Sequence, residues 1–331
     1  MTGRILDPGT LPREERRGRV ERHLLALSGG GYRGLFTATV LRRLEEDGGP
    51  RLASRFDMMA GTSIGGILAI GLACGRSGAD IAELVREHGP AIFRTKPLSF
   101  GGLTKTRYGS GGLSAAITAV LTKPMARRPF REIPARLIVC AIDELTSEPR
   151  IFRTDAASGG RGDDVPTIDV ALATSAAPTY FPPHRINDRN YVDGGLVANA
   201  PDAILLTEAK RLFGCQVDEC HLLSVGTASS SRLGRTDGAP GKLSWVSRHA
   251  LVDLIMEAQE SLALTQAEGL GPGTFLRIDA DPPEPIRLDA VDARTTELLV
   301  ALAQRASDDT RRQRAGDLRR LLAHVPAARS A

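Results

Sequence analysis

The chain has 331 residues, of which 42% are hydrophobic and 25% charged, and its formal net charge is +4. This composition is ordinary for a soluble globular protein, so it excludes a largely disordered chain, a collagen and a polytopic membrane protein. So small a positive charge does not require a nucleic-acid polymer as partner, and none is expected.

The first part of the chain predicts two strand–turn–helix units. Residues 1–22 form a polar, charged segment without an apolar stretch, which excludes a secretory signal peptide and favours a cytoplasmic protein. A short apolar run predicts a strand at 23–28, and apolar spacing predicts a helix at 34–46. The same pattern repeats as a strand at 55–60 and a helix at 64–75.

The rest of the chain continues the alternation of strands and helices. Helices are predicted at 79–92, 113–121, 168–175, 201–213 and 245–268, and strands at 136–142, 150–154, 186–193, 221–226 and 274–279. Such alternation predicts one α/β domain over residues 23–310, with a three-layer α/β/α architecture and a mostly parallel central sheet. A polar helix and an arginine-rich, frayed tail at 311–331 follow. Ligands of such folds bind at the carboxyl edge of the sheet.

The segment between the second strand and its helix carries the strongest chemical signal. Its residues match the pattern G-x-S-x-G, in which a serine sits on a sharp strand-to-helix turn: Gly61, Thr62, Ser63, Ile64 and Gly65. The flanking glycines are needed because the turn leaves no room for side chains. Ser63 is therefore the candidate nucleophile, although an ordinary capped helix start would look similar.

A glycine-rich loop follows the first strand, with the pattern G-x-G-x-x-G: Gly29, Gly30, Gly31, Tyr32, Arg33 and Gly34. One interpretation is a dinucleotide-binding turn, which requires an acidic residue at the end of the second strand. Asp47 follows a helix and Asp57 begins its strand, so neither fits well. The other interpretation is an oxyanion hole, whose amides stabilise a tetrahedral intermediate. Its pairing with the serine turn favours this second interpretation.

A serine nucleophile needs a base. Asp193 ends a predicted strand and is followed by Gly194 and Gly195, so its carboxylate could approach another segment closely. The alternative for this segment is an ordinary Asp-Gly turn. His221 and His249 follow Asp193, in the Ser-Asp-His order of an α/β-hydrolase triad, but neither lies on a loop after a final strand.

The cysteines do not indicate a metal site. Cys74, Cys140, Cys215 and Cys220 include no C-x-x-C pair, and no histidine-rich segment accompanies them. Buried, reduced thiols are expected, and no metal is predicted.

The three motifs GGGYRG, GTSIG and DGG occur in this order, with ATSAAPTYFPP at 173–183 before the last. Together they resemble the patatin-like phospholipases, and the resemblance runs from about residue 23 to residue 226. It implies a serine acyl hydrolase acting on glycerophospholipids. Ser63 would be acylated, Asp193 would be its base in a dyad without histidine, and the loop 29–34 would hold the oxyanion. No cofactor is implied for catalysis.

A narrower resemblance includes the late stretches LVDLIMEAQES and FLRID. With the motifs, these are similar to bacterial patatin-like phospholipase effectors of antiphage defence, which a cyclic dinucleotide such as cyclic GMP-AMP activates. The resemblance implies a cyclic dinucleotide as activator and peripheral contact with a phospholipid membrane, at its inner face. A homo-oligomer is compatible with it. The alternatives are a constitutive lipid acyl hydrolase and a nucleotide-binding protein without hydrolase activity.

The segment 94–112 breaks the helical periodicity and is rich in glycine and basic residues, which predicts a long surface loop. Its candidate contacts are Arg94, Lys96, Lys105, Arg107 and Tyr108. The basic side chains could bind the phosphates of an activating nucleotide, with Tyr108 stacked on a base. They could equally face anionic lipid headgroups. The sequence does not separate the two.

Overall fold

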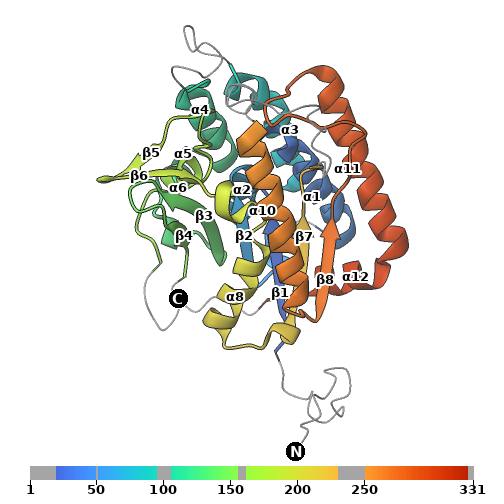
Figure 1. Ribbon diagram of the computed structural model, residues 1–331. Helices are drawn as coiled ribbons and strands as arrows, with labels where there is room; N and C mark the ends of the chain where they lie inside the picture. The colour runs from blue at the N-terminus through green and yellow to red at the C-terminus, as the bar shows by residue number, and fades with distance from the viewer. Residues whose placement is uncertain (1–19, 50, 95–105, 156–161, 230–249, 327–331) are drawn as a thin grey trace, which may run out of the picture.

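A computed structural model describes residues 20–49, 51–94, 106–155, 162–229 and 250–326. An eight-stranded sheet lies at its centre (Figure 1). Five strands run parallel, namely β1 (Arg22–Leu27), β2 (Met58–Thr62), β3 (Leu137–Asp143), β7 (Cys220–Val225) and β8 (Thr274–Ile278). Three more extend the sheet beside β3: β4 (Pro149–Arg153), β5 (His184–Ile186) and β6 (Arg189–Asp193). The predicted strand at 186–193 is thus a hairpin of two short strands.

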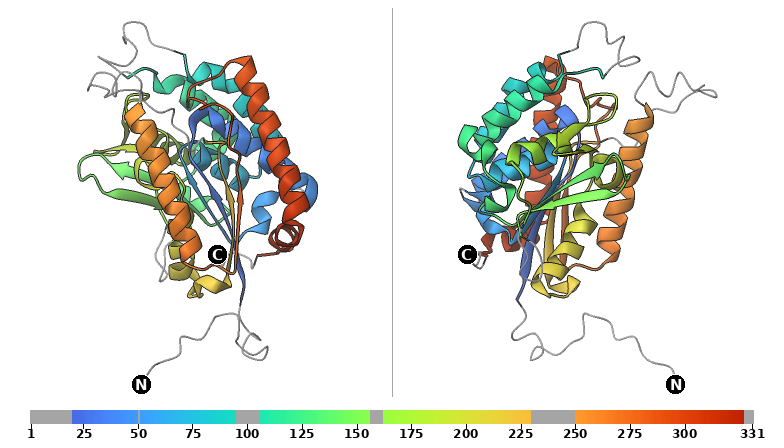
Figure 2. Two further views of the ribbon diagram at one scale, coloured as in Figure 1. Left: turned by 45° about the vertical axis from the view of Figure 1, so that its right-hand side comes forward. Right: turned by 90° about the vertical axis from the view of Figure 1, so that its left-hand side faces the viewer.

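Helices cover both faces of this sheet (Figure 2). One face carries α1 (Gly34–Gly48), α2 (Ile64–Ala73), α3 (Gly78–Ile92), α4 (Ser110–Leu121), α5 (Lys123–Arg127), α6 (Thr167–Thr174), α11 (Ala293–Gln313) and α12 (Ala315–Ala323). The other carries α8 (Asp202–Phe213) and α10 (Ala250–Gly269). Short segments link these elements: α7 (Gly195–Ala198), η2 (Gly31–Arg33), η3 (Leu52–Arg55), η5 (Phe130–Glu132) and η7 (Val217–Glu219).

Alternating side chains of the parallel strands fill two cores. In β1, Leu25 and Leu27 pack into the core beneath α1 and α2, whereas Leu24 and Ala26 pack into the core beneath α8. Because successive residues of a strand point to opposite faces, a strand that is apolar throughout must be covered on both sides. The predicted three-layer α/β/α fold is therefore confirmed.

The apolar stretch from Met58 to Gly75 forms β2, a tight turn and α2, whose residues from Gly65 to Ala73 are all buried. In the described part of the chain, no helix combines the length and the apolar character that crossing a membrane would require.

The C-terminal region differs from its prediction. The boundary proposed at residue 311 falls inside α11, and α12 follows almost directly. Leu318, Leu321 and Leu322 of α12 are buried against the core. The interpretation of 311–331 as a frayed tail is therefore wrong for residues 311–323, because leucines at helical spacing bury one face of an otherwise arginine-rich segment. Residues 327–331 lie outside the described part.

Candidate active site

Ser63 occupies a strained turn between β2 and α2. Its φ of 54° and ψ of −128° lie in a region that non-glycine residues rarely adopt. A Cβ atom on Gly61 would overlap the backbone of Gly65, and one on Gly65 would overlap the carbonyl of Leu27. Only glycines therefore fit two positions before and two after the serine, and the turn projects the hydroxyl of Ser63 above the end of the strand.

Two threonine hydroxyls hold this turn in place. The amide of Ser63 donates to Oγ1 of Thr174, 2.9 Å away, and the hydroxyl of Thr174 donates to the carbonyl of Cys140. On the other side, Thr62 donates to the carbonyl of Ala198 at 2.6 Å. The sequence interpretation gave Thr174 no role, although it lies in the ATSAAP stretch that contributed to the family resemblance.

The structure brings Ser63 and Asp193 together. The hydroxyl of Ser63 donates to Oδ2 of Asp193 at 2.7 Å, and the amide of Gly195 donates to Oδ1 at 2.7 Å. The strand register explains the meeting. Thr62, the residue before the serine, pairs with Cys140 of β3, and Asp193 pairs with the next residue, Ala141.

The strand that carries Asp193 runs antiparallel to its neighbour β3, although the sequence predicted a mostly parallel sheet. β6 is antiparallel to β3, so it carries Asp193 from the rim of the sheet down to the level of the serine. A Cβ atom on Gly194 would overlap the carbonyl of Cys140, so the following residue must be glycine for this approach.

Burial sets the acidity of Asp193. The side chain is buried, and loss of water around the carboxylate raises its pKa to about 7. The hydrogen bonds from Ser63 and Gly195 favour the charged form and limit the rise. A carboxyl group with this pKa can both accept and return a proton near neutral pH, which an ordinary surface aspartate does poorly.

In the glycine-rich loop, two amides have no hydrogen-bond acceptor among the described residues. Four of its amides donate to carbonyl groups within the protein: those of Gly29, Tyr32, Arg33 and Gly34. The amides of Gly30 and Gly31 have no such acceptor among the described residues. Gly31 has a φ of +57° and lines the same pocket as Ser63. Of the six residues predicted to form the oxyanion hole, only Gly30 and Gly31 therefore remain as candidate amide donors. The other four amides make hydrogen bonds that stabilise the loop.

A polar network that the sequence analysis missed supports this loop from behind. Asn199 accepts the amide of Gly29 on its own carbonyl, at 2.9 Å, and its side-chain amide donates to Glu260 at 2.9 Å. Glu260 in turn pairs with the partly buried Arg277, which also donates to the hydroxyl of Ser28 at 2.9 Å. Asn199 comes six residues after Asp193, so only its proximity to the DGG motif could have drawn attention to it.

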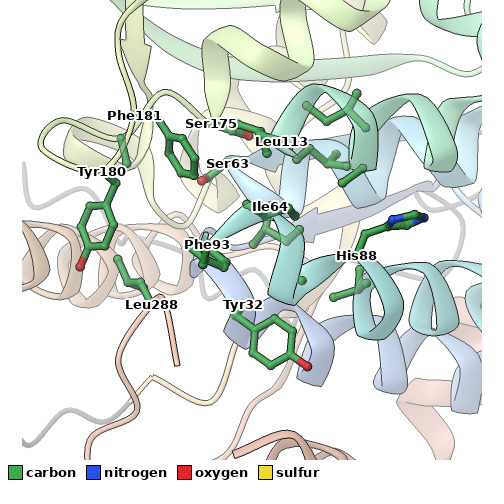
Figure 3. A pocket seen from close by; sticks show the side chains of 18 of the residues that line it. Tyr32, Ser63, Ile64, His88, Phe93, Leu113, Ser175, Tyr180, Phe181 and Leu288 are labelled. Atoms are coloured by element: carbon green, nitrogen blue, oxygen red, sulfur yellow. The ribbon is translucent and has the colours of Figure 1, made fainter. Parts of the chain in front are cut away.

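An apolar pocket opens at Ser63 (Figure 3). In this view, Ser63 lies near Ile64, Ser175 and Phe181, and His88 lies to the right, away from Ser63. Its walls are almost entirely aliphatic and aromatic, and include Ile67, Val85, Ile92, Phe93, Leu113, Ala116, Ile117, Val120, Tyr180, Phe181, Met256 and Leu288. The pocket suits a hydrocarbon chain attached to a group at Ser63.

The expected role of Tyr108 is not supported. The ring is buried against Phe93 and Phe181, and its hydroxyl donates to Asp289 at 2.7 Å, so it is not free to stack on a base. Arg107 forms an ion pair with the same carboxylate at 2.8 Å. The basic residues of the predicted loop gave no indication that Tyr108 packs against Phe93, at the end of α3. Of the other candidates, Arg94 is exposed, and Lys96 and Lys105 lie outside the described residues.

The described histidines do not support the alternative of a Ser-Asp-His triad. His221 is the second residue of β7, so it lies at the end of the parallel sheet opposite to Ser63, which follows the last residue of β2. His249 lies outside the described part. His88 lines the pocket, but the hydroxyl of Ser63 donates to Asp193. Asp57, considered for a dinucleotide site, precedes β2 and is likewise at the opposite end.

Comparison with known proteins gives a consistent picture. The family model described as patatin-like phospholipase matches residues 25–206, more than half of the chain. A protein of Pseudomonas aeruginosa named cGAMP-activated phospholipase is 38% identical, with 82% of each chain covered. One of the same name from Vibrio cholerae is 32% identical, covering 85% of this chain and 88% of that one. Patatin-like protein 1 of Oryza sativa subsp. indica is 30% identical, covering 84% and 78%.

Proposed function

The chain belongs to the patatin-like phospholipase family, and we propose that it is a phospholipase A-type acyl hydrolase in which Ser63 is the nucleophile and Asp193 the base. The observation that carries this assignment is the 2.7 Å hydrogen bond from the hydroxyl of Ser63 to the buried carboxylate of Asp193. A serine hydroxyl is a weak nucleophile until a neighbouring base accepts its proton.

The first half of the reaction forms an acyl-enzyme. Ionised Asp193 accepts the hydroxyl proton as Oγ of Ser63 attacks the ester carbonyl carbon. The oxyanion that develops accepts hydrogen bonds from the amides of Gly30 and Gly31 and from that of Ile64, the first residue of α2. A helix N-terminus and free amides both favour negative charge there. When the ester bond breaks, protonated Asp193 gives its proton to the departing alcohol oxygen, and the acyl group stays on Ser63.

The second half repeats these steps with water. Asp193 accepts a proton from a water molecule that attacks the acyl carbonyl, and the resulting oxyanion meets the same amides. Collapse releases the fatty acid, and Oγ of Ser63 recovers the proton from Asp193. No histidine, metal or organic cofactor takes part in either half.

The pocket supports a fatty acyl ester as the substrate class. Ile117 and Val120 of α4 line it together with Phe93, and few polar atoms are exposed on its walls. Each methylene buried there contributes about 0.8 kcal/mol to binding. Substrates with long acyl chains should therefore bind better than short ones.

The exposed surface of α10 supports peripheral contact with a lipid bilayer. Leu251, Leu254 and Ile255 are 46%, 38% and 40% exposed in the first turns of this helix. The next residue, Met256, lines the pocket. Exposed aliphatic side chains beside the pocket can enter a lipid interface and bring the ester to Ser63.

The names of two relatives support regulation by a cyclic dinucleotide. Two proteins that match most of this chain are named for activation by cGAMP, and we extend that regulation to this chain, with cyclic GMP-AMP or a similar dinucleotide as the activator. Of the basic residues considered for its phosphates, Arg94 is exposed, whereas Arg107 is engaged with Asp289.

Fatty-acid release from phospholipid vesicles tests both parts. The wild type, Ser63→Ala and the control Ser261→Ala, an exposed serine of α10, are compared with and without cyclic GMP-AMP. Release by the wild type and the control only in the presence of the nucleotide is the expected result. Equal release by Ser63→Ala refutes the serine mechanism. Full release without nucleotide refutes the regulation and leaves a constitutive acyl hydrolase.

A further inference from the structure

A cluster of ionisable side chains lies at the end of the sheet opposite to Ser63. His23 of β1 and His221 of β7 pair directly in the parallel ladder, near the amino ends of both strands. Both rings are buried, and Glu21 lies just before β1 with its carboxylate facing them. The proposed hydrolase mechanism uses none of these three residues.

Each of the two rings makes a hydrogen bond through its Nδ1 nitrogen. Nδ1 of His23 lies 3.3 Å from the carbonyl of Leu321, which can only accept, so this nitrogen carries the proton. Nδ1 of His221 lies 3.0 Å from the hydroxyl of Thr274. Nε2 of His221 is buried and has no hydrogen bond to any residue that the structure describes. A second-sphere partner on Nδ1 that leaves Nε2 available is the usual arrangement of a metal-binding histidine.

The distances between the three candidate ligand atoms, one each from Glu21, His23 and His221, suit a small divalent cation. Oε2 of Glu21 lies 3.4 Å from Nε2 of His221 and 3.9 Å from Nε2 of His23. All three atoms lie within 4.8 Å of one another. Ligands at 2.0–2.1 Å from a tetrahedral zinc ion stand about 3.3 Å apart, so modest side-chain movement would close the site. From this geometry we propose that Glu21, His23 and His221 bind a divalent transition metal, with zinc as the best fit and water as the fourth ligand.

Contacts around the proposed site reach other elements of the fold. His324 stacks on His23 with ring centroids 3.9 Å apart and contacts Asp57 at 2.8 Å. The metal would therefore tie the start of β1 to β7 and, through these contacts, to the C-terminal helix. The guanidinium of Arg320, 4.0 Å from Glu21, opposes the cation weakly because both side chains are half exposed.

Zinc binding by the full-length protein tests the site. After chelation and dialysis, the wild type should bind about one zinc ion per chain in a competition titration, and zinc should raise its melting temperature. Glu21→Gln should weaken binding by about tenfold or more, whereas Glu268→Gln, which removes a charge from an exposed glutamate of α10, should not. His221→Gln should abolish binding, with circular dichroism as the check that it folds.

Two results would overturn the metal site. One is a wild type that neither retains zinc nor gains stability from it. The other is wild-type zinc affinity in Glu21→Gln or in a folded His221→Gln variant, which would place the metal elsewhere. Neither result bears on the lipase proposal, because Ser63 and Asp193 lie at the opposite end of the sheet.

Discussion

Replacing Asp193 by asparagine should remove activity and raise stability. The amide has nearly the same shape and can still accept from Gly195, but it cannot accept the proton of Ser63. Loss of the general base should lower kcat by about a hundredfold or more. The stability gain follows from the pKa of Asp193, which burial raises from 3.8 to about 7. Because the pKa of Asp193 is higher in the folded than in the unfolded state, its full contribution to stability is present below about pH 3.8. That contribution is lost as the pH rises through 7, where the wild-type carboxyl group ionises.

The size of the gain can be worked out from the shift. The shift of about three pKa units corresponds to a stability gain of about 4 kcal/mol for the variant above pH 7. At pH 5, which is closer to the unfolded-state pKa, the expected gain is about 2 kcal/mol. With an unfolding entropy of about 2.1 cal/mol/K per residue, 4 kcal/mol raises the melting temperature by about 6 °C in a chain of this length. Melting curves of both proteins at pH 5 and pH 8 measure it. A variant equal to or less stable than the wild type at pH 8 would refute this account of the buried carboxylate.

Three further predictions concern the same site. For the wild type acting on a soluble ester, kcat/KM should rise about tenfold per pH unit up to about pH 7 and then level off, because Asp193 must be ionised; a flat profile from pH 5 to 8 would contradict this. Asn199→Ala should lower kcat about tenfold or more with little change in KM, since it removes the bond to Glu260 behind the oxyanion loop, and the exposed Asn190→Ala serves as control. Ala116→Phe, which fills the pocket wall, should shift preference toward shorter acyl esters in a chain-length series; an unchanged preference would place the acyl chain elsewhere.

The elements nearest to the motifs were predictable because their constraints are local. Gly61 and Gly65 show where the chain turns too sharply for side chains, and that pattern survives in the sequence whatever surrounds it. A parallel sheet then places the first two strand ends side by side, so the loop at Gly29–Gly34 and Ser63 could be expected near each other.

The supporting residues depend on contacts far apart in the chain. Thr174 holds Ser63 from 111 residues away, and Glu260 reaches Asn199 across 61 residues. No short pattern encodes such pairs. Tyr108 looked available because its neighbours are basic and glycine-rich, yet Asp289 and the aromatic rings bury it. The direction of β6 also escaped prediction, because a short strand beside a hairpin turn carries no signal of its orientation.

Covalent labelling tests the central claim most directly. The wild type is treated with a fluorophosphonate at pH 8, digested and mapped by mass spectrometry, beside Ser63→Ala and Asp193→Asn. The account predicts one stoichiometric adduct, on Ser63, absent from Ser63→Ala and formed much more slowly in Asp193→Asn. An adduct on another residue, or labelling of Asp193→Asn at the wild-type rate, would contradict a Ser63 nucleophile activated by Asp193.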